Sequence, residues 1–206
     1  MADNNGKGCG CFGIGCLVVV IVGGIVLGLL GFAGWQVYQG ALGFTEEGPR
    51  ELPQVEVDPG HFNELQQRLT AFEQMEGDAQ LRLSAEDLNQ FVHNSPQLQE
   101  ARDAVYFEIA DGITYSQVSI PLTQVPFMSD RWVNGRLGLQ LSIQDGQPTV
   151  RVESLTVGGK PAPSAFMDQV QKQDLGQDLM QNPEVAKALK GVKSLNVEGN
   201  EIILSK

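Results

Sequence analysis

The sequence predicts an α+β protein, in which an N-terminal transmembrane helix precedes a curved antiparallel β-sheet packed against helices. Three observations carry this prediction. An uncharged apolar stretch covers residues 14–38. Segments with helical spacing flank a central region in which apolar residues alternate, which favours helices gathered on one face of a sheet. Two Asp-Gly pairs, at 111–112 and 145–146, interrupt the alternation where hairpin turns are expected.

The composition limits the classes of function. The chain has 206 residues, with 14 basic and 25 acidic side chains and a formal net charge of −11. Nucleic-acid binding requires a basic face, so we expect no nucleic acid among the partners. An apolar fraction of 42% excludes a wholly disordered chain. All three cysteines lie in the first 16 residues, which excludes a disulfide-stapled domain.

The apolar stretch near the N-terminus is long enough to cross a bilayer. Residues 8–45 carry no charge, and Ile14–Gly34 alone supplies 21 residues, where a spanning helix needs about 20. Trp35 and Tyr38 stand at its C-terminal edge, where aromatic rings prefer the headgroup region. A cleaved signal peptide is the alternative, with Ala41-Leu42-Gly43 as a cleavage-like site. The length of the apolar stretch favours an uncleaved anchor.

The charges beside the span predict its orientation. Lys7 precedes it, and Glu46 and Glu47 follow it. Positive residues favour the cytoplasmic side. We therefore expect a short Gly/Cys-rich cytoplasmic tail, a transmembrane helix, a Pro/Gly linker and an extracytoplasmic α+β domain, with bounds at 1–13, 14–38, 39–60 and 61–206. The outer part has no cysteine, which suits an oxidising compartment.

Small residues within the span could bring two helices together. Gly24, Gly28 and Gly31 share one helix face, and such a face allows close helix packing in lipid. A homodimer through this helix is one interpretation. The other is the ordinary frequency of glycine in membrane helices.

Three cysteines beside the span have two interpretations. Cys9, Cys11 and Cys16 are candidates for S-acylation, as juxtamembrane thiols can be. The alternative is a small, flexible flank kept reduced by the cytosol. Three thiols do not complete a tetrahedral metal site. The Gly-x-Gly-x-x-Gly pattern at residues 8–13 lacks the strand that a dinucleotide site needs before it.

The first half of the outer domain reads as helices around a short strand. Residues 39–60 have Pro and Gly punctuation and predict a spacer. A helix is expected from His61, with apolar residues three and four apart and Gly77 as its stop. A strand over 79–83 follows. Ser84, with two acids behind it, indicates the cap of a second helix that ends at Pro96.

The centre predicts two long hairpins. Apolar residues alternate over 105–109, and their phase shifts after the 111–112 turn, which predicts a β-bulge near Ser116 or Gln117. The second hairpin alternates from Leu137 to Ile143, and a second phase shift predicts a bulge near Glu153 or Ser154. Helical spacing returns over 166–189, and a last hairpin turns at Gly199-Asn200.

No pattern in the sequence indicates catalysis. The chain has two histidines, His61 and His93, each at the end of a predicted helix. A zinc site needs three or four converging ligands, and we interpret both histidines as surface residues. The motifs of serine hydrolases, phosphate-binding loops and metalloproteases are missing from the sequence. We therefore expect no enzyme activity and no cofactor.

The apolar sheet face has two readings. Its residues can fill a core, or they can line a groove for a lipid tail, with Leu139, Leu141 and Phe166 as the first groove candidates. The apolar loop Val125-Pro126-Phe127-Met128 is either the lip of such a groove, a membrane-touching edge, or a loop tucked under the sheet.

Several short motifs follow the anchor in a suggestive order. They are Leu-Ser-Ala-Glu-Asp-Leu-Asn at 83–89, a hairpin over 105–120, Asn134-Gly135-Arg136-Leu137, and Ser154-Leu155-Thr156-Val157-Gly158-Gly159 with Pro161 or Pro163 before a helix. Over residues 80–206 the chain resembles the single-span bacterial envelope proteins of the YpmS type, which are thought to be related to tubular lipid-binding folds. The resemblance implies a sheet curled around a long helix, an apolar interior and no catalysis.

Two functions remain open at this point. The first is a single-pass membrane protein whose extracytoplasmic domain binds a lipid or another apolar ligand. The second is an anchored adaptor of the cell envelope, whose acidic surface meets a protein partner. An open apolar groove would favour the first, and a filled core with an exposed apolar patch would favour the second.

Overall fold

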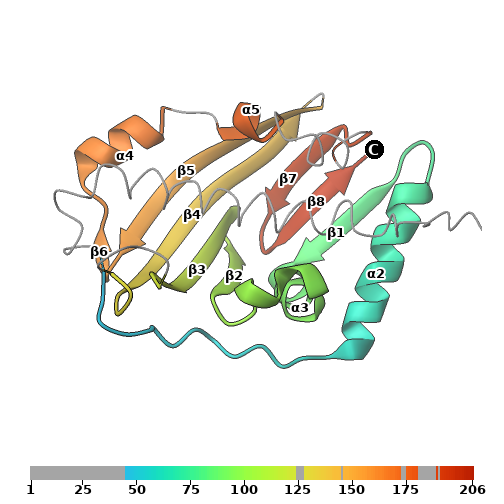
Figure 1. Cartoon of the computed structure of the whole chain (residues 1–206). Helices are drawn as coiled ribbons and strands as arrows, with labels where there is room; N and C mark the ends of the chain where they lie inside the picture. Colours follow the sequence, from blue (N-terminus) through green and yellow to red (C-terminus); the bar gives the residue numbers. More distant parts are fainter. Residues whose placement is uncertain (1–44, 124–127, 145, 173–174, 181–188, 190) are drawn as a thin grey trace, which may run out of the picture.

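The computed structural model describes residues 45–123, 128–144, 146–172, 175–180, 189 and 191–206 (Figure 1). The expected cytoplasmic tail and transmembrane helix lie outside these residues. Among the described residues, no helix combines the length and the apolar composition that a membrane crossing requires.

An antiparallel sheet of eight strands forms the body of the protein. The strands are β1 (Gln80–Ser84), β2 (Val105–Ala110), β3 (Ile113–Pro121), β4 (Trp132–Gln144), β5 (Gln147–Val157), β6 (Lys160–Pro161), β7 (Ser194–Glu198) and β8 (Glu201–Ser205). Their order is β1-β8-β7-β4-β3-β2, and β5 pairs with both β4 and β6. One edge of β4 meets β5, so β3 and β7 share its other edge.

The helices are α2 (Pro59–Gln74), α3 (Ala85–Asn94), the 3-10 helix η3 (Pro96–Ala101), α4 (Ser164–Val170) and α5 (Leu175–Met180). Each of the first two begins at a side-chain cap. Asp58 accepts the N–H of Gly60, and Ser84 and Asp87 form a reciprocal capping box. The cap predicted at Ser84 is confirmed. The helical spacing predicted over 166–179 is divided between α4 and α5.

Helices and strands bury their apolar residues in one cluster. The cluster joins the helix residues Leu65, Leu69, Phe72, Leu88, Phe91, Val92 and Val170 to the strand residues Leu81, Leu83, Phe107, Ile109, Leu137, Leu139, Leu141, Ile143, Val150, Val152, Ile202 and Leu204. The strand residues alternate along each strand, so one sheet face is buried. The α+β class is therefore confirmed for the described residues.

The first hairpin turns where the sequence predicts. Asp111 and Gly112 have φ of 53° and 77°, the left-handed backbone that a two-residue hairpin turn requires. The second hairpin joins β4 to β5 as expected. Its Asp145 lies outside the described residues.

One of the two predicted bulges is confirmed and one is wrong. Between β4 and β5, Gly138 faces Ser154 and Leu139 faces Val152, which leaves Glu153 as the extra residue. Between β2 and β3 the register is unbroken. The apolar phase shift there has another cause, because two hydroxyl residues, Thr114 and Ser116, occupy buried positions on the core face of β3.

Side chains from helices cover the outer strands. Arg68 of α2 donates to the carbonyl of Arg82 on β1. Asn89 of α3 pairs with both the N–H and the C=O of Phe107 on β2, at 2.8 and 2.9 Å. Such contacts occupy backbone groups that an edge strand would otherwise offer to another chain.

Residues 45–58, predicted as part of a spacer, run along the domain as an extended segment from the start of β4 to α2 (Figure 1). We call this segment the strap. Glu46 pairs with Trp132 through two backbone hydrogen bonds of 2.9 Å. The described part of the folded unit therefore includes residues 45–58, which the sequence predicts as part of the linker of 39–60.

Candidate functional site

Two groups of predicted site residues lie outside the described residues. They are the helix-packing glycines Gly24, Gly28 and Gly31 and the S-acylation candidates Cys9, Cys11 and Cys16. The groove candidates are described. Leu139 is 0% exposed and Leu141 is 6% exposed, and both belong to the core cluster. Phe166 is half-buried and packs against the same cluster.

A small apolar cavity opens beside Leu141. Its walls come from Ile143, Pro148, Val150 and Leu195, among others, and its volume is about 20 Å³. That volume holds about one water molecule, whereas ligand pockets usually measure several hundred Å³. This cavity is too small for an acyl chain.

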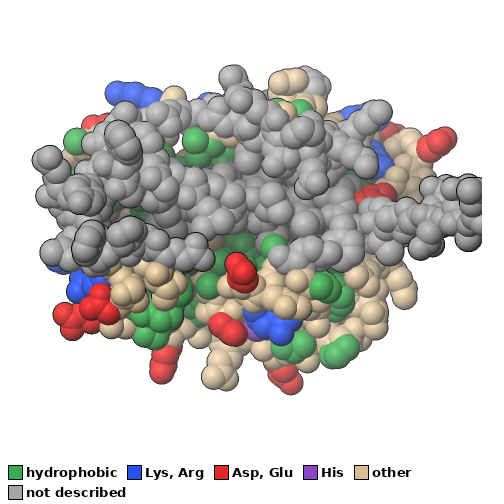
Figure 2. Space-filling view, viewed as in Figure 1, with side chains coloured by type: hydrophobic (Ala, Val, Ile, Leu, Met, Phe, Trp, Pro, Cys, Tyr) green, Lys and Arg blue, Asp and Glu red, His purple; other side chains and the backbone are tan. Residues whose placement is uncertain are grey.

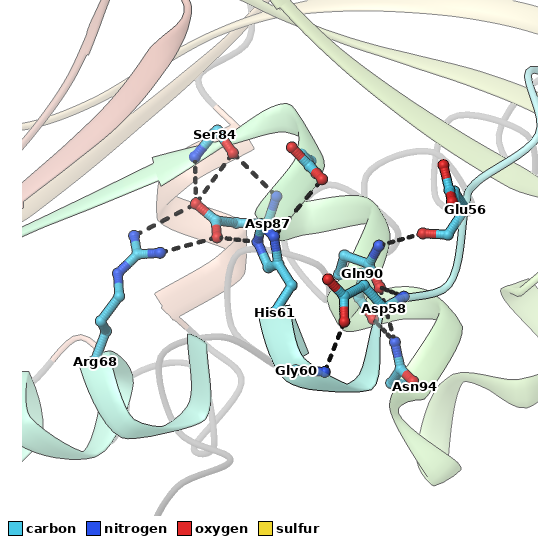
Figure 3. A network of polar contacts seen from close by, with 10 residues as sticks. Glu56, Asp58, Gly60, His61, Arg68, Ser84, Asp87, Gln90 and Asn94 are labelled. Carbon is cyan, nitrogen blue, oxygen red and sulfur yellow. Dashed lines mark hydrogen bonds and ion pairs between the residues drawn. The ribbon is translucent and has the colours of Figure 1, made fainter. Parts of the chain in front are cut away.

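A buried carboxylate, Asp87, is the centre of a polar network between α2 and α3 (Figure 3). Its Oδ2 accepts the backbone N–H of Ser84 at 2.8 Å and the Ser84 hydroxyl at 3.1 Å. Its Oδ1 accepts from Arg68 at 3.0 Å and lies 2.8 Å from His61 Nε2. The second nitrogen of His61, Nδ1, lies 3.6 Å from Glu86.

These contacts decide the ionisation of Asp87. Burial raises the pKa of its carboxyl, but hydrogen bonds from Ser84, His61 and Arg68, with the charge of Arg68, outweigh burial and lower the pKa below 3.8. Asp87 is therefore an anion at neutral pH, and His61 Nε2 donates to it because a carboxylate only accepts.

The order of groups in this network differs from that of a nucleophilic triad. In a serine triad the imidazole lies between the hydroxyl and the carboxylate. Here the carboxylate of Asp87 lies between the Ser84 hydroxyl and His61. The arrangement joins the two helices and does not activate Ser84. The interpretation of His61 as a simple surface residue missed these two acidic partners.

A buried amide holds each end of the strap. At the α3 end, the amide nitrogen of Gln90 donates to the Glu56 carbonyl at 2.5 Å (Figure 3). Its oxygen accepts the N–H of Asp58 at 3.1 Å and an N–H of the Asn94 side chain at 3.1 Å. Gln90 therefore fixes the strap where it enters α2.

The second amide, Asn134 on β4, is fully buried. Its oxygen accepts the backbone N–H of Arg50 at 3.1 Å and the Ser119 hydroxyl at 2.8 Å. Its nitrogen donates to the Gly48 carbonyl at 2.9 Å and to the Glu46 carboxylate. All four hydrogen-bonding positions of this amide are used.

The start of the strap is fastened to the same end of the sheet. The Arg131 guanidinium donates to the Thr45 hydroxyl at 2.8 Å and to the Thr45 carbonyl at 2.6 Å. It also lies 3.6 Å from the Glu47 carboxylate. The strap is thus held by backbone pairing, by an arginine and by two buried amides.

Two hydroxyls on the core face of β3 have no hydrogen-bond partner among the described residues. They belong to Thr114, which faces Leu139 of β4, and to Ser116, which faces Leu137. Both residues are fully buried. Buried polar atoms without partners are uncommon and invite a structural explanation.

Within the described ranges, no three His, Cys, Asp or Glu side chains converge as metal ligands would. Comparisons with family models, with curated proteins and with solved structures found no match to this chain.

Proposed function

We propose that this chain is a single-pass membrane protein with a cytoplasmic N-terminus, whose extracytoplasmic α+β domain is a non-enzymatic interaction module for a protein partner in the cell envelope. The observation that supports an interaction module is the packed core. Leu139, the central groove candidate, is 0% exposed. A groove candidate that is buried in the core favours a binding site on the surface of the domain.

The distribution of charge suggests the chemistry of the partner. Residues 45–103 carry 13 acidic and 4 basic side chains, and residues 104–206 carry 11 and 9. Residues 45–103, which include the strap, α2 and α3, therefore hold most of the net negative charge, and acidic side chains stand along the lower margin of Figure 2. A basic partner surface complements this charge and associates faster at low salt.

The anchor and its orientation are tested by thiol labelling. The native cysteines lie only in the predicted cytoplasmic tail. In intact cells, a membrane-impermeant maleimide is expected to label Asn63→Cys, on the exposed side of α2, in a chain whose native cysteines are serine. The tail cysteines of the unaltered chain should react only after permeabilisation. The reverse pattern would refute the proposed topology.

The interaction is tested by photocross-linking from the surface of the full chain in its native membrane. A photoreactive residue at Gln67, which is exposed on α2 one turn after Glu64, should give one discrete adduct with a protein. That adduct should weaken as salt rises. The matched control is Gln140, exposed on β4, which should give none. Equal adducts at both positions, or none at either, would count against the acidic surface as the binding face.

A second candidate function has one specific observation in its favour. The unpartnered hydroxyls of Thr114 and Ser116 lie among apolar residues of the core face, and an amphipathic ligand could satisfy them if the helices parted from the sheet. Native mass spectrometry decides the matter after the domain is released by a protease site placed at residue 40. A fixed added mass, lost in Thr114→Val/Ser116→Ala, supports the ligand. A bare chain mass supports the interaction module.

A further inference from the structure

The chain between the proposed anchor and the domain is short. The predicted span ends at residue 38 and the strap begins at Thr45, so six residues separate them. A fully extended chain covers at most about 3.3–3.6 Å per residue, so these six reach roughly 20 Å. Thr45 therefore lies within roughly 20 Å of the bilayer surface.

One end of the sheet is fixed to Thr45. Arg131 holds both the hydroxyl and the carbonyl of Thr45, and Trp132, the first residue of β4, pairs with Glu46. β4 continues for 13 residues, which at about 3.3 Å each amounts to about 40 Å. Gln144, at its other end, is thus roughly 40 Å from Trp132, and the two ends of the sheet are not equivalent with respect to the membrane.

The amide of Asn134 keeps the tether short. If residues 45–58 were free, 20 residues would separate the span from α2, with a reach of roughly 65 Å. Three of the four hydrogen bonds of Asn134 hold Glu46, Gly48 and Arg50 on β4. By holding the strap on the sheet, Asn134 thereby reduces the reach of the chain between the span and the folded domain about threefold.

We infer that the end of the sheet formed by the start of β4 is a membrane-apposed surface, which the clamped strap holds against the headgroups of the chain's own bilayer. This inference rests on the proposed anchor and deepens it. The half-buried Trp132 and the Arg131 side chain stand at this end. Tryptophan and arginine are residue types that tolerate the headgroup region well. The strap then leads away to α2, which leaves the acidic surface free for a partner.

Energy transfer from Trp132 tests the inference. The chain has two tryptophans, Trp35 and Trp132, so Trp35→Phe leaves Trp132 as the sole donor. The full-length variant is reconstituted into phosphatidylcholine vesicles that contain a small fraction of dansyl-labelled phosphatidylethanolamine. We expect strong transfer to the headgroup acceptor. Transfer no greater than that from free tryptophan mixed with the same vesicles would overturn the inference.

Three further variants test whether the length of chain between the span and the sheet sets the position of this surface. Twenty Gly/Ser residues inserted after residue 40 raise the root-mean-square tether length from roughly 13 Å to roughly 28 Å, and transfer should fall severalfold. Asn134→Ala should also lower the transfer, whereas Gln90→Ala, which releases only the far end of the strap, should not. Transfer that is unchanged by the insertion would show that the tether does not set the position, and would overturn the inference.

The same samples distinguish a failure of the proposed anchor from a failure of the membrane-apposed surface. A chain that does not float with the vesicles in a density gradient contradicts the proposed membrane anchor. A chain that floats but shows no transfer contradicts only the membrane-apposed surface.

Discussion

Replacing Asp87 with asparagine isolates the charge at the centre of the α2–α3 network. The substitution keeps the shape of the side chain and can still accept the N–H of Ser84. It removes the negative charge that faces Arg68 at 3.0 Å and His61 at 2.8 Å. We therefore expect the helix cap to survive and the connection between the two helices to weaken.

The magnitude follows from the number and the exposure of these contacts. A hydrogen bond to a charged group contributes about 1.5–3 kcal/mol. The side chains of Arg68 and His61 are 43% and 26% exposed, so solvent screens part of this energy. We expect the free energy of unfolding to fall by about 2–3 kcal/mol. For a domain of this size, that corresponds to a fall in Tm of roughly 4–12 °C.

The assay is thermal unfolding of the full chain in detergent, followed by circular dichroism from pH 7 to pH 2. The folded-state pKa of Asp87 is lowered, so its contribution to stability is present above pH 3.8 and is lost as pH falls through the lowered pKa. The difference between the two proteins should shrink in acid. Glu64→Gln, at an exposed position of α2, is the control. An Asp87→Asn protein within about 0.5 kcal/mol of the unaltered chain at pH 7 would refute this reasoning.

Three other predictions use the same unfolding assay. Burial lowers the pKa of His93, helped by Arg102 and opposed by Asp103, so its contribution to stability is present above pH 6.5 and is lost as pH falls through the lowered pKa; His93→Gln should flatten that slope. Gly138→Ala would place a Cβ 2.6 Å from the Ser154 hydroxyl, and should cost about 1–3 kcal/mol, whereas Gly48→Ala, with open space, should cost little. Lys206→Met removes an ammonium group that donates to three carbonyls at the end of α2, and should lower Tm by roughly 2–4 °C.

Local signals in the sequence were enough for much of the fold. The Asp-Gly turn at 111–112, the cap at Ser84 and the bulge at Glu153 each depend on residues within a few positions of one another. Their physical causes, a left-handed turn, a helix N-terminus and a change of strand phase, are local as well. Such features can be predicted from a single sequence.

The bulge predicted near Ser116 or Gln117 is wrong, because polar side chains of β3 face the core and shift the apolar pattern without a change of register. Thr114 and Ser116 are fully buried, and the apolar Ile113 and Tyr115 lie on the other face of β3. Arg136 stacks over the Tyr115 ring at 3.7 Å and gives that face an aromatic residue of its own. Alternation alone does not tell which face of a strand is the core when both faces carry apolar groups.

The packing of the strap could not be predicted from local sequence patterns, because its partners are distant in the chain. Arg50 and Asn134 are 84 positions apart, and Glu56 and Gln90 are 34 apart. An extended segment interrupted by prolines has few ladder hydrogen bonds of its own, so other groups must satisfy its backbone. The pattern of residues within the strap does not indicate which distant groups those are.

The sequence nevertheless contains a weaker signal for the two buried amides, Gln90 and Asn134, that hold the strap. A buried amide must use its two donors and two acceptor positions, so an amide at a buried position implies a partner with free backbone groups. Gln90 lies among Leu88, Phe91 and Val92 on the apolar part of α3. Read in this way, such an amide predicts that an irregular segment packs beside it. The same logic makes the Asn134→Ala variant informative, since it would remove three strap contacts without altering any apolar residue of the core.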